Sequence, residues 1–210
     1  MKFGVFIYDG VEPLDLATYG VLSMARRVIP QIELCTIAPR AGVVALANGL
    51  RVIADYGIGD APPCDILVVT GGPGWTAQAA AADTLAFLRE RATSAKMVSV
   101  CTGAMILAAA GILNGHRATT KREVLPPETS PLQRLRDEYP AIAADAASVV
   151  DSGGVTTGGG VTLCIDTMLH VLAREFGKDA AQETARIIEY SRAWDANRRT
   201  FPAIVETAFA

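Results

Sequence analysis

The segment MVSVCTGAMILAAAG, residues 97–111, constrains the fold of this chain more than any other part of its sequence. Its first four residues are mostly apolar and predict a strand buried on both faces, and the Ala-rich run from Thr102 to Ala110 predicts a helix packed against that sheet. Cys101 lies where strand turns into helix, and Gly111 ends the helix. Such a turn places the sulfur near the unsatisfied amides of the first helical turn, which favour thiolate over thiol. The segment therefore predicts a nucleophile elbow with a cysteine at its tip.

Strands and helices alternate along the rest of the chain, and this alternation decides the fold class. Right-handed crossovers join such units into an α/β fold, a doubly wound and mainly parallel sheet with helices on both faces. Asn48-Gly49 separates two apolar runs and predicts a hairpin over residues 43–56. No strand or helix is predicted for residues 191–210. Strands are predicted at 2–8, 31–38, 66–70, 97–100, 117–120, 148–150 and 155–157, and helices at 11–28, 83–95, 132–139, 161–176 and 179–190.

Composition limits the domain count and the kind of partner. The chain has 210 residues, half of them apolar, so a single domain over residues 1–210 is expected. A net charge of −3 with scattered acids and bases gives no basic face for nucleic acid and no polybasic membrane patch. The four cysteines lack CxxC spacing and the two histidines lie apart from them, which indicates a reduced, cytoplasmic protein without metal or cofactor. A small-molecule substrate is the expected partner.

Glycine pairs follow a second predicted strand, at Gly71-Gly72. Ligands collect at the carboxyl ends of parallel strands, and glycines let backbone amides approach a ligand. The amides of Gly72 and Thr102 could therefore form an oxyanion hole beside Cys101. The alternative is that GGPG is only a tight turn. Neither GGPGW nor SGGVTTGGG fits a dinucleotide or phosphate-loop pattern.

A thiol that attacks an electrophile needs a proton donor or acceptor nearby. Asp15 has apolar neighbours, and both burial and a neighbouring thiolate would raise its pKa. Glu12 is the rival. Either acid could instead stabilise the first turn of a helix, a role that fits Glu12 better.

The other reactive or aromatic side chains have structural interpretations. Trp75 either walls the pocket or packs after a turn. Cys35 and Cys164 read as core residues, Cys64 as an inert loop thiol, His170 as a packed helix residue and His116 as part of a surface turn.

The segments GVEPLD, GGPG, SVCTGAMILAAAGILNGHRATT and TTGGGVTLCID resemble the ThiJ/PfpI superfamily, whose domain has a flavodoxin-like fold. Within it, the chain is most similar to isonitrile hydratases and to a domain of certain AraC-type regulators. The resemblance implies Cys101 as nucleophile, Asp15 as its acidic partner, Thr102 as an active-site neighbour and a homodimer. It also implies that Gly72 and Thr102 form a backbone anion site. The residues predicted to form the oxyanion or substrate-binding site are Gly71, Gly72, Trp75, Thr120 and Lys121.

The sequence departs from the resemblance at two points. Lys121 follows RATT where many relatives carry His, which argues against protease or amidotransferase chemistry with a Cys-His dyad. Glu189-Tyr190 is not followed by the Pro-Pro-Phe motif common in isonitrile hydratases.

The leading functional hypothesis is a cofactorless lyase that hydrates an isonitrile to an N-substituted formamide, using Cys101 and Asp15. One alternative is glyoxalase-like or deglycase-like action on 2-oxoaldehydes. Another is a non-catalytic module in which Cys101 senses oxidation or a ligand.

Overall fold

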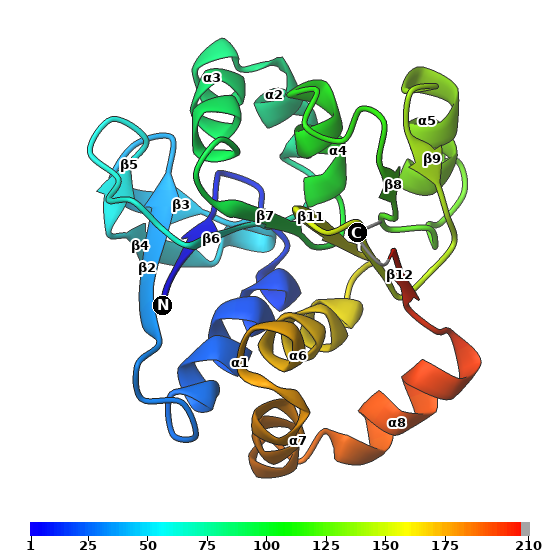
Figure 1. Cartoon of the computed structure of the whole chain (residues 1–210). Coiled ribbons are helices and arrows are strands. Elements are labelled where there is room, and N and C mark those ends of the chain that lie inside the picture. The colour runs from blue at the N-terminus through cyan, green and yellow to red at the C-terminus, as the bar shows by residue number, and fades with distance from the viewer. Residues whose placement is uncertain (207–210) are drawn as a thin grey trace.

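The structure is a computed structural model and describes residues 1–206. A central eight-stranded sheet carries a layer of helices on each face (Figure 1). Neighbouring strands are parallel except for the antiparallel pair β10 and β11. The α/β fold with a mainly parallel sheet is therefore confirmed. In spatial order the strands are β12 (Ile204–Val205), β10 (Val149–Asp151), β11 (Val155–Gly158), β7 (Lys96–Ser99), β6 (Ile66–Val69), β1 (Lys2–Phe6), β2 (Glu33–Ala38) and β5 (Tyr56–Gly57).

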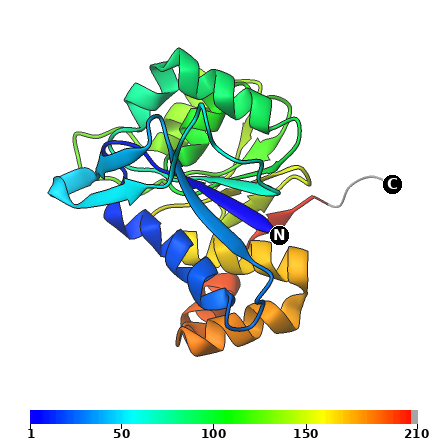
Figure 2. The same cartoon turned by 90° about the vertical axis from the view of Figure 1, so that its left-hand side faces the viewer.

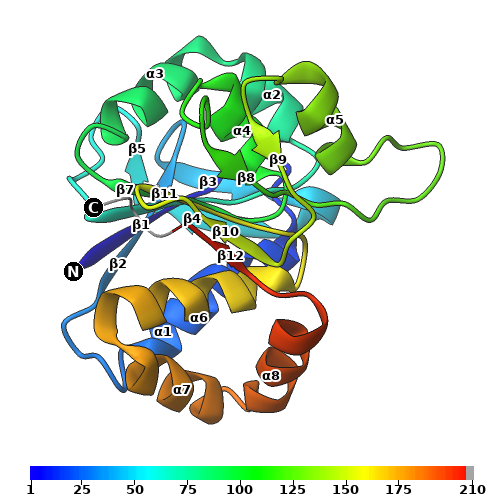
Figure 3. The ribbon, with the colours of Figure 1, turned by 45° about the vertical axis from the view of Figure 1, so that its right-hand side comes forward.

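The helices divide into two groups, one on each face of the sheet, and Figures 1 and 3 show this division from two sides. Every residue of β6 is buried, as expected for a strand covered on both faces. One face carries α2 (Trp75–Ala80), α3 (Ala82–Arg91), α4 (Gly103–Ala109) and α5 (Pro131–Glu138). The other carries α1 (Ala17–Ala25), α6 (Leu163–Phe176), α7 (Lys178–Ile187) and α8 (Ser191–Thr200).

Two small pairs of strands lie outside the main sheet. The predicted hairpin is present as β3 (Gly42–Ala45) and β4 (Arg51–Ala54), and it projects from the body in Figure 2. Its turn is the short 3-10 helix η2 (Ala47–Gly49), in which Asn48 and Gly49 have φ of 60° and 91°, a conformation these residue types tolerate. The predicted strand in RATT is β8 (Arg117–Ala118), which pairs with β9 (Ala143–Ala144).

Several segments differ from the sequence prediction; α2 and β9, for example, have no predicted counterpart. The expected helix over 11–28 begins as the 3-10 helix η1 (Pro13–Leu16), and α1 follows it. The unassigned tail forms α8 and the edge strand β12, which pairs with β10. Trp194 is the one buried residue of α8, so this helix lacks the apolar stripe that would have revealed it. The last part of the tail, residues 207–210, lies outside the described residues.

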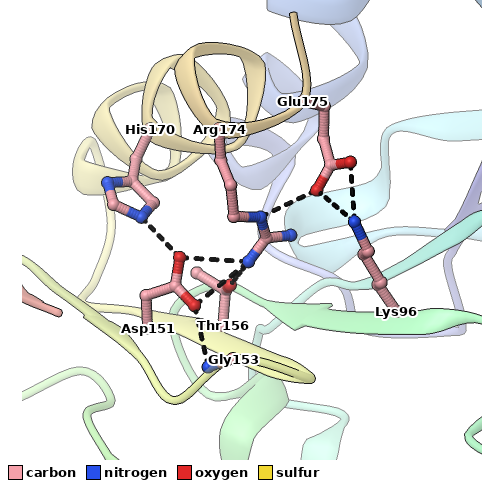
Figure 4. Close-up of polar contacts among 7 residues, drawn as sticks. All are labelled: Lys96, Asp151, Gly153, Thr156, His170, Arg174 and Glu175. Carbon is pink, nitrogen blue, oxygen red and sulfur yellow. Dashed lines mark hydrogen bonds and ion pairs between the residues drawn. The ribbon is translucent and has the colours of Figure 1, made fainter. Parts of the chain in front are cut away.

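A buried carboxylate ties α6 to the edge of the sheet (Figure 4). Asp151, in β10, accepts a hydrogen bond from Gly153 and faces His170 Nε2 at 2.8 Å and Arg174 Nη1 at 3.0 Å. Burial alone would raise the pKa of Asp151, but the His170 hydrogen bond and the charge of Arg174 hold that pKa below its usual value. The donors that keep this carboxylate ionised therefore come from α6 and from the hairpin of β10 and β11.

Candidate active site

The elbow predicted from the sequence is formed by Cys101, between the end of β7 and the start of α4. Cys101 has φ of 52°, a left-handed conformation that costs a non-glycine residue about 1 kcal/mol. Its neighbours hold this conformation from both sides. The Cys101 amide donates to the carbonyl of Gly159 at 3.1 Å, and the Thr120 hydroxyl donates to the carbonyl of Cys101 at 2.7 Å.

The glycine pair after β6 is required by close packing against this elbow. A Cβ atom on Gly71 would lie 2.4 Å from the backbone nitrogen of Thr102 and 2.9 Å from the Cβ of Cys101. Both distances are too short for any side chain. Gly71 is therefore more than part of a tight turn, because its lack of a side chain lets the end of β6 touch the elbow.

Asp15 enters the site from η1 and is completely buried. Its Oδ2 accepts the amide of Gly71 at 2.7 Å, whereas its Oδ1 is buried without a hydrogen-bond partner. Burial, with a smaller contribution from the charge of Glu12, raises the pKa of Asp15 to about 7, although the Gly71 amide and the nearby Cys101 thiol oppose the rise. This carboxyl group can accordingly take up and release a proton near neutral pH.

The structure corrects the expectation that the thiolate of Cys101 is favoured. The side chain is almost buried, at 2% exposed, and burial together with the negative charge of Asp15 raises the pKa of the thiol. The amide of Thr102 and the charge of Lys121 lower that pKa, but they do not compensate. The proton therefore resides on the sulfur while Asp15 is ionised. The first turn of α4 is too weak a source of positive potential to reverse this order.

The predicted oxyanion hole is also different. The amide of Gly72 donates to the Thr102 hydroxyl at 2.8 Å, and the amide of Gly71 is taken by Asp15. The amide of Thr102 acts on the thiol, since it lowers the pKa of Cys101. An oxyanion could gain the Gly72 amide only by displacing the Thr102 hydroxyl.

A cavity of about 530 Å³ opens above Cys101 and Thr102. Trp75 forms part of its wall, as one of its two interpretations predicted, and the guanidinium of Arg134 lies 4.7 Å from the centre of the Trp75 ring. Val124 and Val161 add apolar surface. The loop 119–130, which extends from the body in Figure 3, supplies one side of this cavity.

The remaining candidates take distinct positions. Lys121 lines the cavity, and its ammonium group donates to the carbonyl of Glu123. Thr120 holds the elbow through its hydrogen bond to the Cys101 carbonyl and does not line the cavity. Glu12 lies at the cavity wall and caps the amide of Leu14 at 3.3 Å, which is the helix-end role expected for it. Gly71 likewise acts through Asp15 and not on a ligand.

Two buried groups lie beside the acid and the thiol that the sequence did not predict as part of the site. The hydroxyl of Tyr8 donates to the carbonyl of Thr70 at 3.0 Å, and burial and the charges of Asp15 and Cys101 raise the pKa of Tyr8. Cys164 is buried as expected, and its thiol donates to the carbonyl of Leu14 at 3.7 Å. Tyr8 carried one usable signal, its place at the carboxyl end of the first strand.

The wall residue Arg134 also went unnoticed, because the helix predicted over 132–139, observed as α5, carries no motif that would place it at the site. Within residues 1–206, no three His, Cys, Asp or Glu side chains gather in a way that could hold a metal ion. No histidine lies among the described residues that line the cavity, since His170 belongs to the Asp151 cluster.

Comparison with known proteins places these features in a family. The chain is 32% identical to the isonitrile hydratase of Pseudomonas putida over 197 residues, which cover 92% of this chain and 80% of that enzyme. It is 28% identical to the HTH-type transcriptional regulator GbdR of Pseudomonas aeruginosa, covering 90% of this chain but 48% of the regulator.

Solved structures agree with this placement. A ThiJ/PfpI family protein from Pseudomonas syringae superposes with a TM-score of 0.78 at 27% identity, covering 90% of this chain and 74% of that one. A DJ-1 superfamily protein from Salmonella typhimurium, 24% identical, has the same fold with a TM-score of 0.75 and coverage of 90% and 98%. Residues 1–174 match the DJ-1/PfpI family. The chain therefore belongs to the DJ-1/PfpI family.

Proposed function

We propose that this protein hydrates an isonitrile to an N-substituted formamide, with Cys101 as the nucleophile and Asp15 as the proton carrier. One observation carries the proposal. A fully buried carboxyl group with a pKa of about 7 and an unpartnered oxygen lies beside a thiol at the base of a cavity. The similarity to the Pseudomonas putida enzyme supports the same reaction.

The first half of the reaction uses the proton of the thiol. As the Cys101 sulfur attacks the terminal carbon of the isonitrile, ionised Asp15 takes the thiol proton and then delivers it to that carbon. The product is a thioformimidate, R–N=CH–S–Cys101. A thiol with a raised pKa suits this step, because the base that removes its proton is already in place and operates near neutral pH.

The second half consumes water. Asp15, ionised again, removes a proton from a water molecule that adds to the same carbon, and passes that proton to the nitrogen. As the carbon–sulfur bond breaks, Asp15 takes the proton of the new hydroxyl group and returns it to the sulfur, and the formamide R–NH–CHO leaves. The sum is one isonitrile plus one water to one formamide, so two side chains suffice.

The cavity suits an apolar substituent on the nitrogen. Trp75, Val124 and Val161 provide the apolar surface, and a volume of about 530 Å³ accommodates a small organic group. An isonitrile carries no net charge, which fits a wall where Arg134 is already satisfied by Trp75 and Glu138.

The test is incubation of the purified protein with an alkyl isonitrile, followed by measurement of the formamide. We expect formamide from the wild type and none from Cys101→Ser, with unchanged circular dichroism. Cys35→Ser is the matched control, because it makes the same substitution at a buried cysteine that does not line the cavity. Formation of formamide at equal rates by Cys101→Ser and the wild type would contradict the proposal.

The alternatives receive less support from the site. Conversion of methylglyoxal to lactate is the corresponding test for glyoxalase-like action, for which the residue after RATT is Lys121 and not the His of many relatives. Oxidation sensing at Cys101 is disfavoured because its thiol keeps its proton. Selective oxidation of Cys101 by mild peroxide in a protein without turnover would favour sensing instead.

The proposal includes a cytoplasmic homodimer. Its interface would include the β3–β4 hairpin, where the cross-strand partners Val43 and Ile53 are 69% and 73% exposed. Adjacent apolar side chains at this exposure favour burial against a second copy. Within residues 1–206, no helix has the length and apolar character needed to cross a membrane. A Val43→Glu/Ile53→Lys variant is expected to elute as a folded monomer; an unchanged elution volume would exclude the hairpin as interface.

A further inference from the structure

A second pair of cysteines lies away from the elbow, toward the other end of the central strands. Cys35 lies within β2, and Cys64 lies in the loop that precedes β6. Both thiols are free. Cys35 is buried and Cys64 is half-buried. Their interpretations from sequence, a core residue and an inert loop thiol, left out the fact that the fold brings them together.

A glycine in the strand between them makes the contact possible. Cys35 is the direct partner of Gly4 in the parallel register of β1 and β2, so their side-chain positions lie on the same face of the sheet. A Cβ atom on Gly4 would lie 2.9 Å from the sulfur of Cys64. The Cys64 sulfur therefore occupies the space above Gly4, beside Cys35.

The surroundings of the pair shift the pKa values of the two thiols in opposite directions. The neighbouring Cys35 thiol, together with the positive charges of Arg91 and Lys2, lowers the pKa of Cys64 to about 7, against burial and the charge of Asp65. The Cys64 thiol, followed by burial and a smaller effect of Asp55, raises the pKa of Cys35, whose thiol donates to the carbonyl of Phe3. Cys64 is thus the accessible nucleophile, and Cys35 is the protonated partner behind it.

The loop that carries Cys64 is held by Arg91. Its guanidinium donates to the carbonyl of Pro62 at 3.2 Å and to that of Ala61, and it lies 5.1 Å from the centre of the Phe87 ring. The cation is thereby fixed beside the thiol that it stabilises. This arrangement resembles the electropositive, partly exposed surroundings of reactive cysteines.

We propose that Cys64 and Cys35 form a peroxide-reactive thiol pair, separate from Cys101, that closes to an intramolecular disulfide. The Cys64 thiolate attacks one oxygen of hydrogen peroxide, the O–O bond breaks, and a sulfenic acid and one water form once a proton is taken up. The Cys35 sulfur then attacks the Cys64 sulfur and releases a second water. Two thiols lose two electrons in total, and one peroxide becomes two waters.

The test uses the full-length protein treated with hydrogen peroxide, quenched with iodoacetamide and digested for mass spectrometry. We expect a disulfide-linked peptide pair containing Cys35 and Cys64 in the wild type and in Cys101→Ser. Cys35→Ser is expected to stop at a Cys64 sulfenic acid that dimedone traps, and Cys64→Ser to leave Cys35 unoxidised. Cys164→Ser is the control, and it should form the disulfide at the wild-type rate.

Two further variants test the geometry. Gly4→Ala places a methyl group against the Cys64 sulfur, so the disulfide should form more slowly in a protein whose circular dichroism is unchanged. Lys2→Gln removes one stabilising charge and should slow the alkylation of Cys64 at neutral pH. Oxidation of Cys64 at the rate of buried Cys164, or a wild-type protein whose oxidised Cys64 remains unlinked to Cys35, would overturn the proposal. Both outcomes can be read without any assay of isonitrile hydration, so the pair is tested independently of the proposed function.

Discussion

Two buried aspartates of this protein differ in their hydrogen-bond donors, and their pKa values shift in opposite directions. Asp151 is 3% exposed and is surrounded by donors: His170, Arg174 and the amide of Gly153. Asp15 is fully buried and receives one amide, from Gly71, while its second oxygen has no partner. The pKa of Asp151 is lowered, whereas that of Asp15 is raised to about 7.

The difference separates a carboxylate that stabilises the fold from one that is kept reactive. A satisfied buried carboxylate ties elements together and stays ionised, as Asp151 does between β10 and α6. A buried carboxyl group with too few hydrogen-bond donors is costly to ionise, and groups with such raised pKa values cluster at sites where a proton is transferred. The position of Asp15 beside Cys101, above which the cavity opens, is consistent with that purpose.

The largest expected effect comes from breaking the satisfied site. Asp151→Asn removes the carboxylate that faces both His170 and Arg174, and leaves Arg174 with Glu175 as its remaining acidic partner, so it should lower the free energy of unfolding by about 3 kcal/mol. Urea denaturation at pH 7 measures it. Asp145→Asn is the control, because it removes one partner of the more exposed ion pair with Arg117 and should cost less than about 1 kcal/mol. Equal losses in the two variants would contradict the special role of Asp151.

The unsatisfied site should respond in the opposite direction. Asp15 has a raised pKa, so ionising it costs folding free energy that grows as pH rises from about 4 to about 7. Asp15→Asn removes that cost and should raise the free energy of unfolding at pH 8 by about 2–3 kcal/mol, less than the full linkage value because the amide is also buried.

The pH dependence distinguishes this effect from general repacking. The stability gain of Asp15→Asn should shrink as pH falls and level off below about pH 3, where the wild-type carboxyl group is protonated in both folded and unfolded protein. Formamide production should meanwhile fall by about 100-fold, since the proton carrier is lost. A stability gain that is constant with pH would show that the pKa of Asp15 is the same in the folded and the unfolded protein, so that burial does not raise it.

A smaller effect is expected on the reactivity of Cys101. The charge of Asp15 raises the pKa of the thiol, so Asp15→Asn should speed alkylation of Cys101 by iodoacetamide at pH 8 by about tenfold. The same variant would then lose turnover while gaining thiolate. Slower alkylation in Asp15→Asn would mean that Asp15 promotes ionisation of the thiol in the resting protein.

The smallest expected effect concerns the cavity wall. Arg134→Met removes the cation above Trp75, an interaction worth about 0.5–1 kcal/mol, and leaves the carboxyl and thiol groups untouched. We expect KM for an alkyl isonitrile to change by a few fold with kcat nearly constant. A large loss of kcat would assign Arg134 to the chemical step.

The elbow and the parallel sheet could be predicted from the sequence, because short apolar strands and the VCTG turn are local signals. The sequence could not give the protonation order of Asp15 and Cys101, which depends on burial produced by η1, the end of β6 and α4 together. The contact of Cys35 with Cys64 likewise depends on strand register across Gly4. The polar helix α8 could not be predicted from the apolar pattern, because it buries a single tryptophan.

The most direct test of the central claim is the titration of the Asp15 carboxyl group itself, by carbon NMR of protein labelled in its aspartate side chains and assigned with Asp15→Asn. The account predicts a midpoint near pH 7 for Asp15, while Asp151 remains ionised over the same range. A midpoint near pH 4 for Asp15 would mean that the carboxyl group is an ordinary ionised acid, and the proposed proton transfer with Cys101 would have no basis.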